Sequence, residues 1–251
     1  MRNIRLKAAV LALLVSGSVS ALAVIAVEDP CGGSPYLQVT VDGADPVMRI
    51  CADRVGDNLF AAEFSDAITK GAEGDIATFD GSFTADTDPF IAYVFGVTNL
   101  SMATTTYTFL FLSPYAAGSY DLIKSSHVSS VTDSDADDGV VVGTSMFPKI
   151  HNPMIDGVPS AGAHGDGCTL TPGAGSGPCD SFPLIMAPIA PTAVAGVFGI
   201  TVKFTLSPGD IYSASGRFEL KHDTRVPAPG ALAFLGLGLA ALGLMHRRRK
   251  A

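Results

Sequence analysis

Hydrophobic and polar residues alternate with a period of two along two neighbouring stretches of the chain. In Phe198–Leu206 apolar residues occupy every second position between Gly, Thr and Lys, and Tyr212–Leu220 repeats the pattern between Ser, Arg and Glu. Successive side chains of a strand point to opposite faces, so each stretch predicts a half-buried β-strand. Ser207-Pro208-Gly209-Asp210 between them has the composition of a turn, and together they predict a β-hairpin.

Earlier parts of the chain carry further strand patterns. Leu37–Val41 and Ile91–Val97 alternate in the same way, and Thr104–Leu112 is rich in β-branched and aromatic residues. Asp42-Gly43 is a turn signal after the first of these stretches. Short strands with frequent turn signals predict an all-β exodomain, an antiparallel β-sandwich, over residues 24–225.

Two stretches of this exodomain depart from the alternating pattern. Leu59–Thr69 carries a weak 3.6-residue periodicity and is the one helix candidate in the exodomain. Pro153–Pro191 is rich in Gly and Pro, which predicts a long irregular excursion rather than a second domain.

The first 23 residues have the pattern of a secretion signal. Basic residues precede the apolar stretch Ala8–Val15, and Ala21-Leu22-Ala23 offers the small residues that signal peptidase requires. The alternative is an uncleaved anchor, since Ala8–Val27 contains 20 residues without a charge. Ser16-Gly17-Ser18 lowers the hydrophobicity of that run, so residues 1–23 predict a cleaved signal peptide.

The last 26 residues, 226–251, read as a membrane-sorting tail. Val226-Pro227-Ala228-Pro229 cannot continue a strand or lie inside a helix, because proline lacks an N–H group and its φ is fixed. The uncharged run Ala231–Met245 would span roughly 22 Å as a helix, which is short for a bilayer core unless flanking residues contribute. Arg247-Arg248-Arg249-Lys250 then provides a basic stop expected to stay cytoplasmic.

This tail resembles the PEP-CTERM sorting signal of Gram-negative bacteria. In that family a Val-Pro-Glu-Pro motif precedes a Gly/Ala/Leu-rich helix and a terminal Arg cluster; Val226, Pro227 and Pro229 match the motif, whereas Ala228 stands where Glu is usual. The resemblance implies that exosortase removes the tail after a transient stay in the inner membrane. It also implies export to the cell surface or to an exopolysaccharide matrix.

Charge is distributed unevenly along the chain. All 24 acidic residues lie between Ala8 and Met245, whereas both ends are basic. An acidic body repels phosphate groups, which argues against nucleic acid as a partner.

Four cysteines, Cys31, Cys51, Cys168 and Cys179, occur in a chain that is expected to be exported. An even number in that setting predicts two disulfides, for which three connectivities are open. Local pairing, Cys31 with Cys51 and Cys168 with Cys179, is the simplest. The spacings contain no C-x-x-C motif, so metal ligation by cysteine is not expected.

An acidic loop carries the one candidate metal site. Asp133, Asp135, Asp137 and Asp138 place carboxylates at alternate positions before Gly139, as in D-x-D-x-D-G calcium loops. Gly139 comes one position late and Thr144 replaces the usual bidentate Glu, so the loop is not an EF-hand. A structural Ca²⁺ is one reading, and a solvated acidic turn is the other; no other cofactor is expected.

The sequence indicates no catalytic constellation. The five histidines show no ligand spacing, and the nucleophile motif G-x-S-x-G does not occur. We therefore expect a non-enzymatic surface or matrix protein with a structural or adhesive role, whose partners are signal peptidase, exosortase and exopolysaccharide.

Two other functions stay open. A carbohydrate-binding module would need an aromatic platform, and because Trp is absent the tyrosines would have to serve. Those considered for this role are Tyr93, Tyr107, Tyr115 and Tyr212. The remaining hypothesis is a secreted hydrolase with an unrecognised site.

Overall fold

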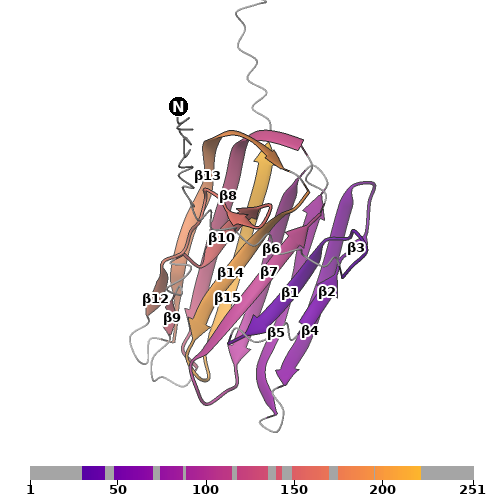
Figure 1. Ribbon diagram of the computed structural model, residues 1–251. Coiled ribbons are helices and arrows are strands. Elements are labelled where there is room, and N and C mark those ends of the chain that lie inside the picture. Colours follow the sequence, from indigo (N-terminus) through magenta and orange to yellow (C-terminus); the bar gives the residue numbers. More distant parts are fainter. Residues whose placement is uncertain are drawn as a thin grey trace, which may run out of the picture.

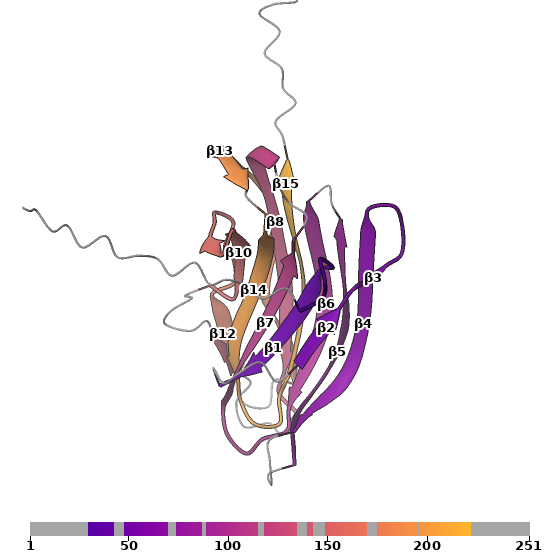
Figure 2. The ribbon, with the colours of Figure 1, turned by 45° about the vertical axis from the view of Figure 1, so that its right-hand side comes forward.

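A computed structural model describes residues 30–42, 48–69, 74–86, 89–114, 118–134, 140–142, 149–169, 175–194 and 196–221. Within these ranges every regular element is a strand, and no helix occurs that could cross a membrane. The strands form two antiparallel sheets that lie face to face (Figures 1 and 2). The all-β, two-sheet architecture predicted from the alternating pattern is confirmed, while the expected signal peptide and tail lie outside the described residues.

One sheet has eight strands. In spatial order they are β11 (Val158–Pro159), β10 (His151–Ile155), β14 (Phe198–Leu206), β7 (Thr105–Ser113), β1 (Tyr36–Val41) and β2 (Met48–Cys51), with β9 (Val140–Val142) paired to β14 and β12 (Gly167–Thr169) paired to β9. The other sheet has seven strands. Their order is β13 (Ser176–Val194), β8 (Gly118–Thr132), β15 (Ile211–Lys221), β6 (Phe90–Asn99), β5 (Asp75–Asp86), β4 (Leu59–Thr69) and β3 (Asp53–Arg54).

The predicted hairpin of Phe198–Leu206 and Tyr212–Leu220 is wrong, although both stretches are strands. β14 pairs with β7 and β10, whereas β15 pairs with β6 and β8 in the opposite sheet. The turn between β14 and β15 therefore crosses from one sheet to the other. The alternation of a strand reports which residues face the core, and it does not report which strand lies beside it.

The helix candidate Leu59–Thr69 is also corrected, because it forms strand β4. Its buried apolar residues, Phe60, Phe64 and Ile68, are four residues apart. A spacing of four fits the 3.6-residue period approximately and the period of two without remainder. Pairing with β5 along the whole strand selects the extended form.

The expected irregular excursion Pro153–Pro191 contains regular structure, which is a third correction. It includes β11 and β12, most of β10 and most of the 19-residue strand β13. Strand β13 pairs with β8, with register shifts between Pro178 and Asp180, between Phe182 and Ile185, and between Pro188 and Thr192. Each shift lies at a proline, so the missing N–H groups coincide with interruptions of the ladder.

Aromatic rings from both sheets fill the core. Phe95 stacks on Phe109 of the opposite sheet with centroids 4.3 Å apart, and Phe204 contacts Tyr212 at 4.2 Å. Tyr93 stacks on Phe111 at 4.8 Å. These contacts place large inward-facing rings between the sheets, where burial of apolar area supplies most of the stability.

Candidate functional site

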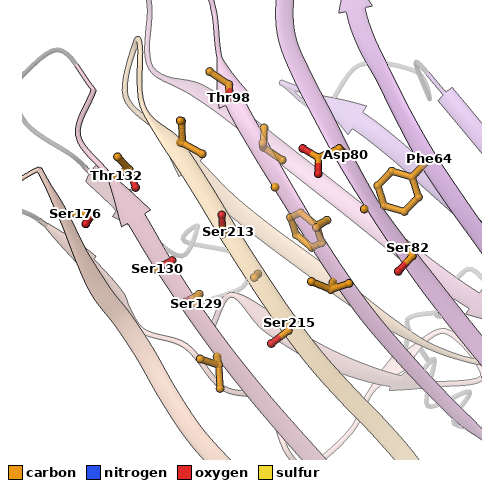
Figure 3. Close-up of a pocket in the computed structure, with 18 of the residues that line it drawn as sticks. Phe64, Asp80, Ser82, Thr98, Ser129, Ser130, Thr132, Ser176, Ser213 and Ser215 are labelled. Atoms are coloured by element: carbon orange, nitrogen blue, oxygen red, sulfur yellow. The ribbon is translucent and has the colours of Figure 1, made fainter.

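The outer face of the seven-stranded sheet carries an open groove of about 1220 Å³ that crosses β4, β5, β6, β15, β8 and β13. Figure 3 shows hydroxyl-bearing residues distributed over this face rather than gathered at one point. We call this feature the outer groove. Its outward-facing lining residues are Glu63, Ser65, Asp80, Ser82, Val94, Gly96, Thr98, Val128, Ser130, Thr132, Ser176, Pro178, Ile211, Ser213 and Ser215.

Strand register arranges these side chains in rows. In the central row Asp80 pairs with Gly96, Gly96 with Ser213, and Ser213 with Ser130. These positions face outward because their neighbours along each strand, such as Tyr212 and Ala214 on β15, are buried in the core. Adjacent strands are about 4.8 Å apart, so the rows form a regular array in which polar side chains are interspersed with apolar ones such as Val94 and Val128.

Ten of the fifteen outward-facing lining residues carry hydrogen-bonding side chains, and the others are Val, Ile, Pro and Gly. A Cβ atom at Gly96 would lie 3.4 Å from Asp80 Oδ1 and 3.8 Å from Ser213 Oγ, so the bare glycine leaves a notch between a carboxylate and a hydroxyl. Val94 and Val128, which lie on either side of Ser215 in the neighbouring row, are about half exposed. None of the described lining residues is basic, and its aromatic residues, Phe64 and Phe95, belong to the buried core.

A second polar feature lies inside the sandwich, where three histidines and a tyrosine meet. Tyr93 Oη lies 3.0 Å from His127 Nδ1 and 2.8 Å from His151 Nδ1. The His151 ring lies 5.4 Å from the His127 ring and 5.9 Å from the His164 ring, between centroids. We call this cluster, together with Ser125, Gly162 and Tyr212, the histidine seam.

The seam joins the two sheets. Tyr93, Ser125 and His127 come from β6 and β8 of the seven-stranded sheet, whereas His151 begins β10 of the eight-stranded sheet. His151 and His164 exchange two backbone hydrogen bonds of 2.8 Å each. Ser125 Oγ lies 3.1 Å from His151 Nε2 and donates to the Gly162 carbonyl oxygen at 2.9 Å.

Burial keeps the imidazole rings of the seam neutral. Desolvation, followed by the neighbouring His164, lowers the pKa of His127 to about 4. Burial and the adjacent histidines hold the pKa of His151 well below its usual range, and burial with nearby Lys149 lowers the pKa of His164. Burial and Tyr212 raise the pKa of the Tyr93 hydroxyl, so the described groups of the seam are uncharged at neutral pH.

The contact of Ser125 with His151 does not form a usable nucleophile. Both residues are fully buried, and the hydroxyl hydrogen of Ser125 is engaged by Gly162. A nucleophile must reach its substrate, and within the described residues neither side chain has exposed surface.

Three of the tyrosines considered as a sugar platform lie in the core, which corrects that expectation. Tyr107 and Tyr212 have no exposed surface and Tyr93 is 4% exposed. Their rings pack against phenylalanines between the sheets and cannot stack on an external ligand. Tyr115 lies outside the described residues.

Of the proposed calcium ligands, only Asp133 is described. It follows β8, is buried, and its N–H group donates to the Gly175 carbonyl oxygen at 2.7 Å. Asp135, Asp137 and Asp138 lie outside the described residues. Among all residues that the structure describes, no group of three or more His, Cys, Asp or Glu side chains is arranged so that it could hold a metal ion.

The cysteines pair locally in the structure, as Cys31–Cys51 and Cys168–Cys179. The first bond ties the segment before β1 to the edge strand β2, and the second joins β12 to β13 and so links the two sheets. The sorting motif Val226–Pro229 and the basic stop Arg247–Lys250 lie outside the described residues.

The sequence pattern missed the histidine seam. The signal that could have found it lies in β8, where Ser125, His127 and Ser129 occupy alternate positions before Val131. Polar residues at every second position usually indicate the solvent-exposed face of a strand, but in β8 that face is buried. His151 and His164 approach the seam through tertiary folding, so their spacing along the chain carries no signal.

Neither a scan against models of known protein families nor a search of curated proteins gives a match to this chain.

Proposed function

We propose that this chain is an exported cell-surface or biofilm-matrix protein with a structural or adhesive role, and that the outer groove is its contact surface for exopolysaccharide. The observation that carries the proposal is the lattice of hydroxyl groups across the seven-stranded sheet. The proposal assigns no catalytic reaction. The signal peptide (1–23) and the PEP-CTERM-like tail (226–251) supply the route to the surface through signal peptidase and exosortase.

The chemistry of the outer groove favours a neutral glycan chain as the partner. Serine and threonine hydroxyls both donate and accept hydrogen bonds, as sugar hydroxyls do, and a row of them can engage successive sugar units. Asp80 and Glu63 add acceptors and repel anionic polymers, while no described lining residue is basic. A neutral polysaccharide therefore complements this face better than an acidic one.

A carbohydrate-binding module with an aromatic platform is the second candidate, and it finds less support. Within the described residues the tyrosines named for it are buried. A surface that binds through hydroxyl rows, without ring stacking, is expected to bind each sugar weakly and to gain strength from many contacts along a polymer.

Retention of the purified chain on the native host's exopolysaccharide, with dextran as a neutral probe, tests the proposal. Ser213→Val combined with Ser215→Val removes two hydroxyls from the centre of the outer groove, and we expect retention to fall at least fivefold. The matched control is Thr106→Val with Thr108→Val, on outward positions of β7 in the opposite sheet, which should leave retention unchanged. Equal retention of both variants and the wild type would refute the assignment of the groove.

A further inference from the structure

The histidine seam contains one hydrogen bond whose direction is certain, and it determines all the others. A carbonyl oxygen can only accept, so Ser125 must donate its single hydroxyl hydrogen to Gly162. Ser125 Oγ then accepts from His151, which places a proton on His151 Nε2. A neutral imidazole carries one proton, so His151 Nδ1 is an acceptor.

The same logic extends into the seven-stranded sheet. Tyr93 must donate its hydroxyl hydrogen to His151 Nδ1, at 2.8 Å, and therefore accepts from His127 Nδ1–H at 3.0 Å. His127 Nε2 is left as an acceptor and faces the Tyr212 hydroxyl at 3.4 Å. The hydrogen bonds run in one direction, from Tyr212 through His127, Tyr93, His151 and Ser125 to the Gly162 carbonyl, and the two histidines hold opposite tautomers.

Protonation of either His127 or His151 is incompatible with this arrangement of hydrogen-bond donors and acceptors. A charged imidazole has two N–H donors and no acceptor. If His151 gains a proton at Nδ1, Tyr93 must accept from both rings, and its own hydroxyl hydrogen is left buried without an acceptor. If His127 gains one at Nε2, that nitrogen can no longer accept from the Tyr212 hydroxyl.

The Tyr93–His151 bond, which protonation of His151 disrupts, is one of the links between residues 150–166 and the opposite sheet. His151 and Gly162 both belong to this segment, while their partners Tyr93 and Ser125 lie on β6 and β8. We propose that the histidine seam is an acid-sensitive latch that holds segment 150–166 against the seven-stranded sheet and releases it at low pH.

The direction of the pH effect follows from linkage. In the opened segment His151 and His164 have their ordinary pKa near 6.5, whereas in the closed seam burial lowers the pKa of both. Below about pH 6.5 the open form therefore binds more protons than the closed form, and the closed form is fully favoured only above that pH. Among the described residues, the other ionisable groups that face the seam are Tyr93, Tyr212, His164 and Lys149, and Lys149 pairs with Asp166.

The tautomers provide the first test. In the full chain labelled with ¹⁵N at histidine, NMR at pH 7.5 should find the proton of His127 on Nδ1 and that of His151 on Nε2. Single histidine substitutions assign the signals. Identical tautomers at the two positions, or a charged ring at that pH, would overturn the proposal.

Hydrogen–deuterium exchange of the full chain, corrected for the intrinsic effect of pH, provides the second test. Between pH 7.5 and 4.5, exchange in segment 150–166 should rise at least tenfold more than exchange in β6. Tyr93→Phe should give this increase already at pH 7.5, whereas Tyr107→Phe, which deletes a buried hydroxyl bonded to Asn99 outside the seam, should not. Should Tyr93→Phe fail to fold, Ser125→Ala replaces it. A segment that exchanges in step with β6 throughout, or equal effects of the variant and its control, would refute the latch.

Discussion

Gly216 shows how a single residue sets the geometry of the seam. It lies on β15 directly between Tyr93 on β6 and His127 on β8, and all three positions face the core. Because Gly216 has no side chain, the Tyr93 ring can extend across β15 and reach His127. A Cβ atom at this position would lie 2.5 Å from Tyr93 Oη and 2.6 Å from Cζ, closer than any real contact.

Replacement of Gly216 by Ala should therefore destabilise the protein, by about 1–3 kcal/mol in urea unfolding, which is typical of overpacked cores. The Tyr93 ring cannot move away freely because it stacks on Phe111. Gly96→Ala is the matched control, since its Cβ would meet nothing closer than Asp80 Oδ1 at 3.4 Å. We expect the control to be neutral or slightly stabilising; equal losses for the two variants would show that the space at Gly216 is not required.

At the scale of elements, Asn99 organises the crossings between the sheets. Its side-chain amide donates to the carbonyl oxygens of Leu206 and Ser207 at 2.8 and 3.0 Å, and its oxygen accepts from Tyr107. Asn99 ends β6, just before the chain crosses to β7. Leu206 and Ser207, to which it donates, lie where the chain crosses from β14 to β15. The same amide donates to the Ala103 carbonyl oxygen between β6 and β7, so one buried side chain bonds backbone groups at both crossings.

The two disulfides act on different elements, and their removal can be compared directly. Cys31 and Cys51 are 20 residues apart and Cys168 and Cys179 are 11 apart. Loop entropy predicts that each bond stabilises the fold by about 3 kcal/mol, with slightly less for the shorter loop. Replacing each pair by Ser, one pair at a time, and measuring urea unfolding checks this expectation. A loss below about 1 kcal/mol for either pair would contradict it, and a thiol titration of the untreated exodomain should find no free cysteine.

At the scale of the whole molecule, the proposed export and sorting would depend on the two ends. Intact-mass measurement of the protein from its native host should give a chain that begins near Val24 and ends near Val226–Pro229, because on the proposed route signal peptidase and exosortase remove the ends. Deleting Arg247–Lys250 should impair retention in the inner membrane, since the basic stop is lost. A mass corresponding to all 251 residues would contradict both cleavages, and unchanged location of the deletion variant would contradict the sorting tail.

The sequence by itself determined that the body is built from strands and which residues of β1, β6, β14 and β15 face inward. Alternation in Ile91–Val97 and Phe198–Leu206 is a local property of the extended chain, so it can be read without knowing the neighbouring strands. Local patterns were also misleading in two places. The apolar spacing of four in Leu59–Thr69 fits a helix as well as a strand. The prolines of β13 lie where its ladder is interrupted, and they indicated an irregular segment instead of a strand.

Tertiary structure alone decided which sheet each strand joins and what the polar residues do. The turn at Ser207–Asp210 sends β15 to the opposite sheet, and that crossing places Tyr212 and Gly216 beside His127. The outer groove likewise exists because register aligns Asp80, Gly96, Ser213 and Ser130 across four strands. Residues far apart in the chain meet only when strands pair and pack. Their spacing along the sequence therefore cannot predict a site that is built by strand pairing.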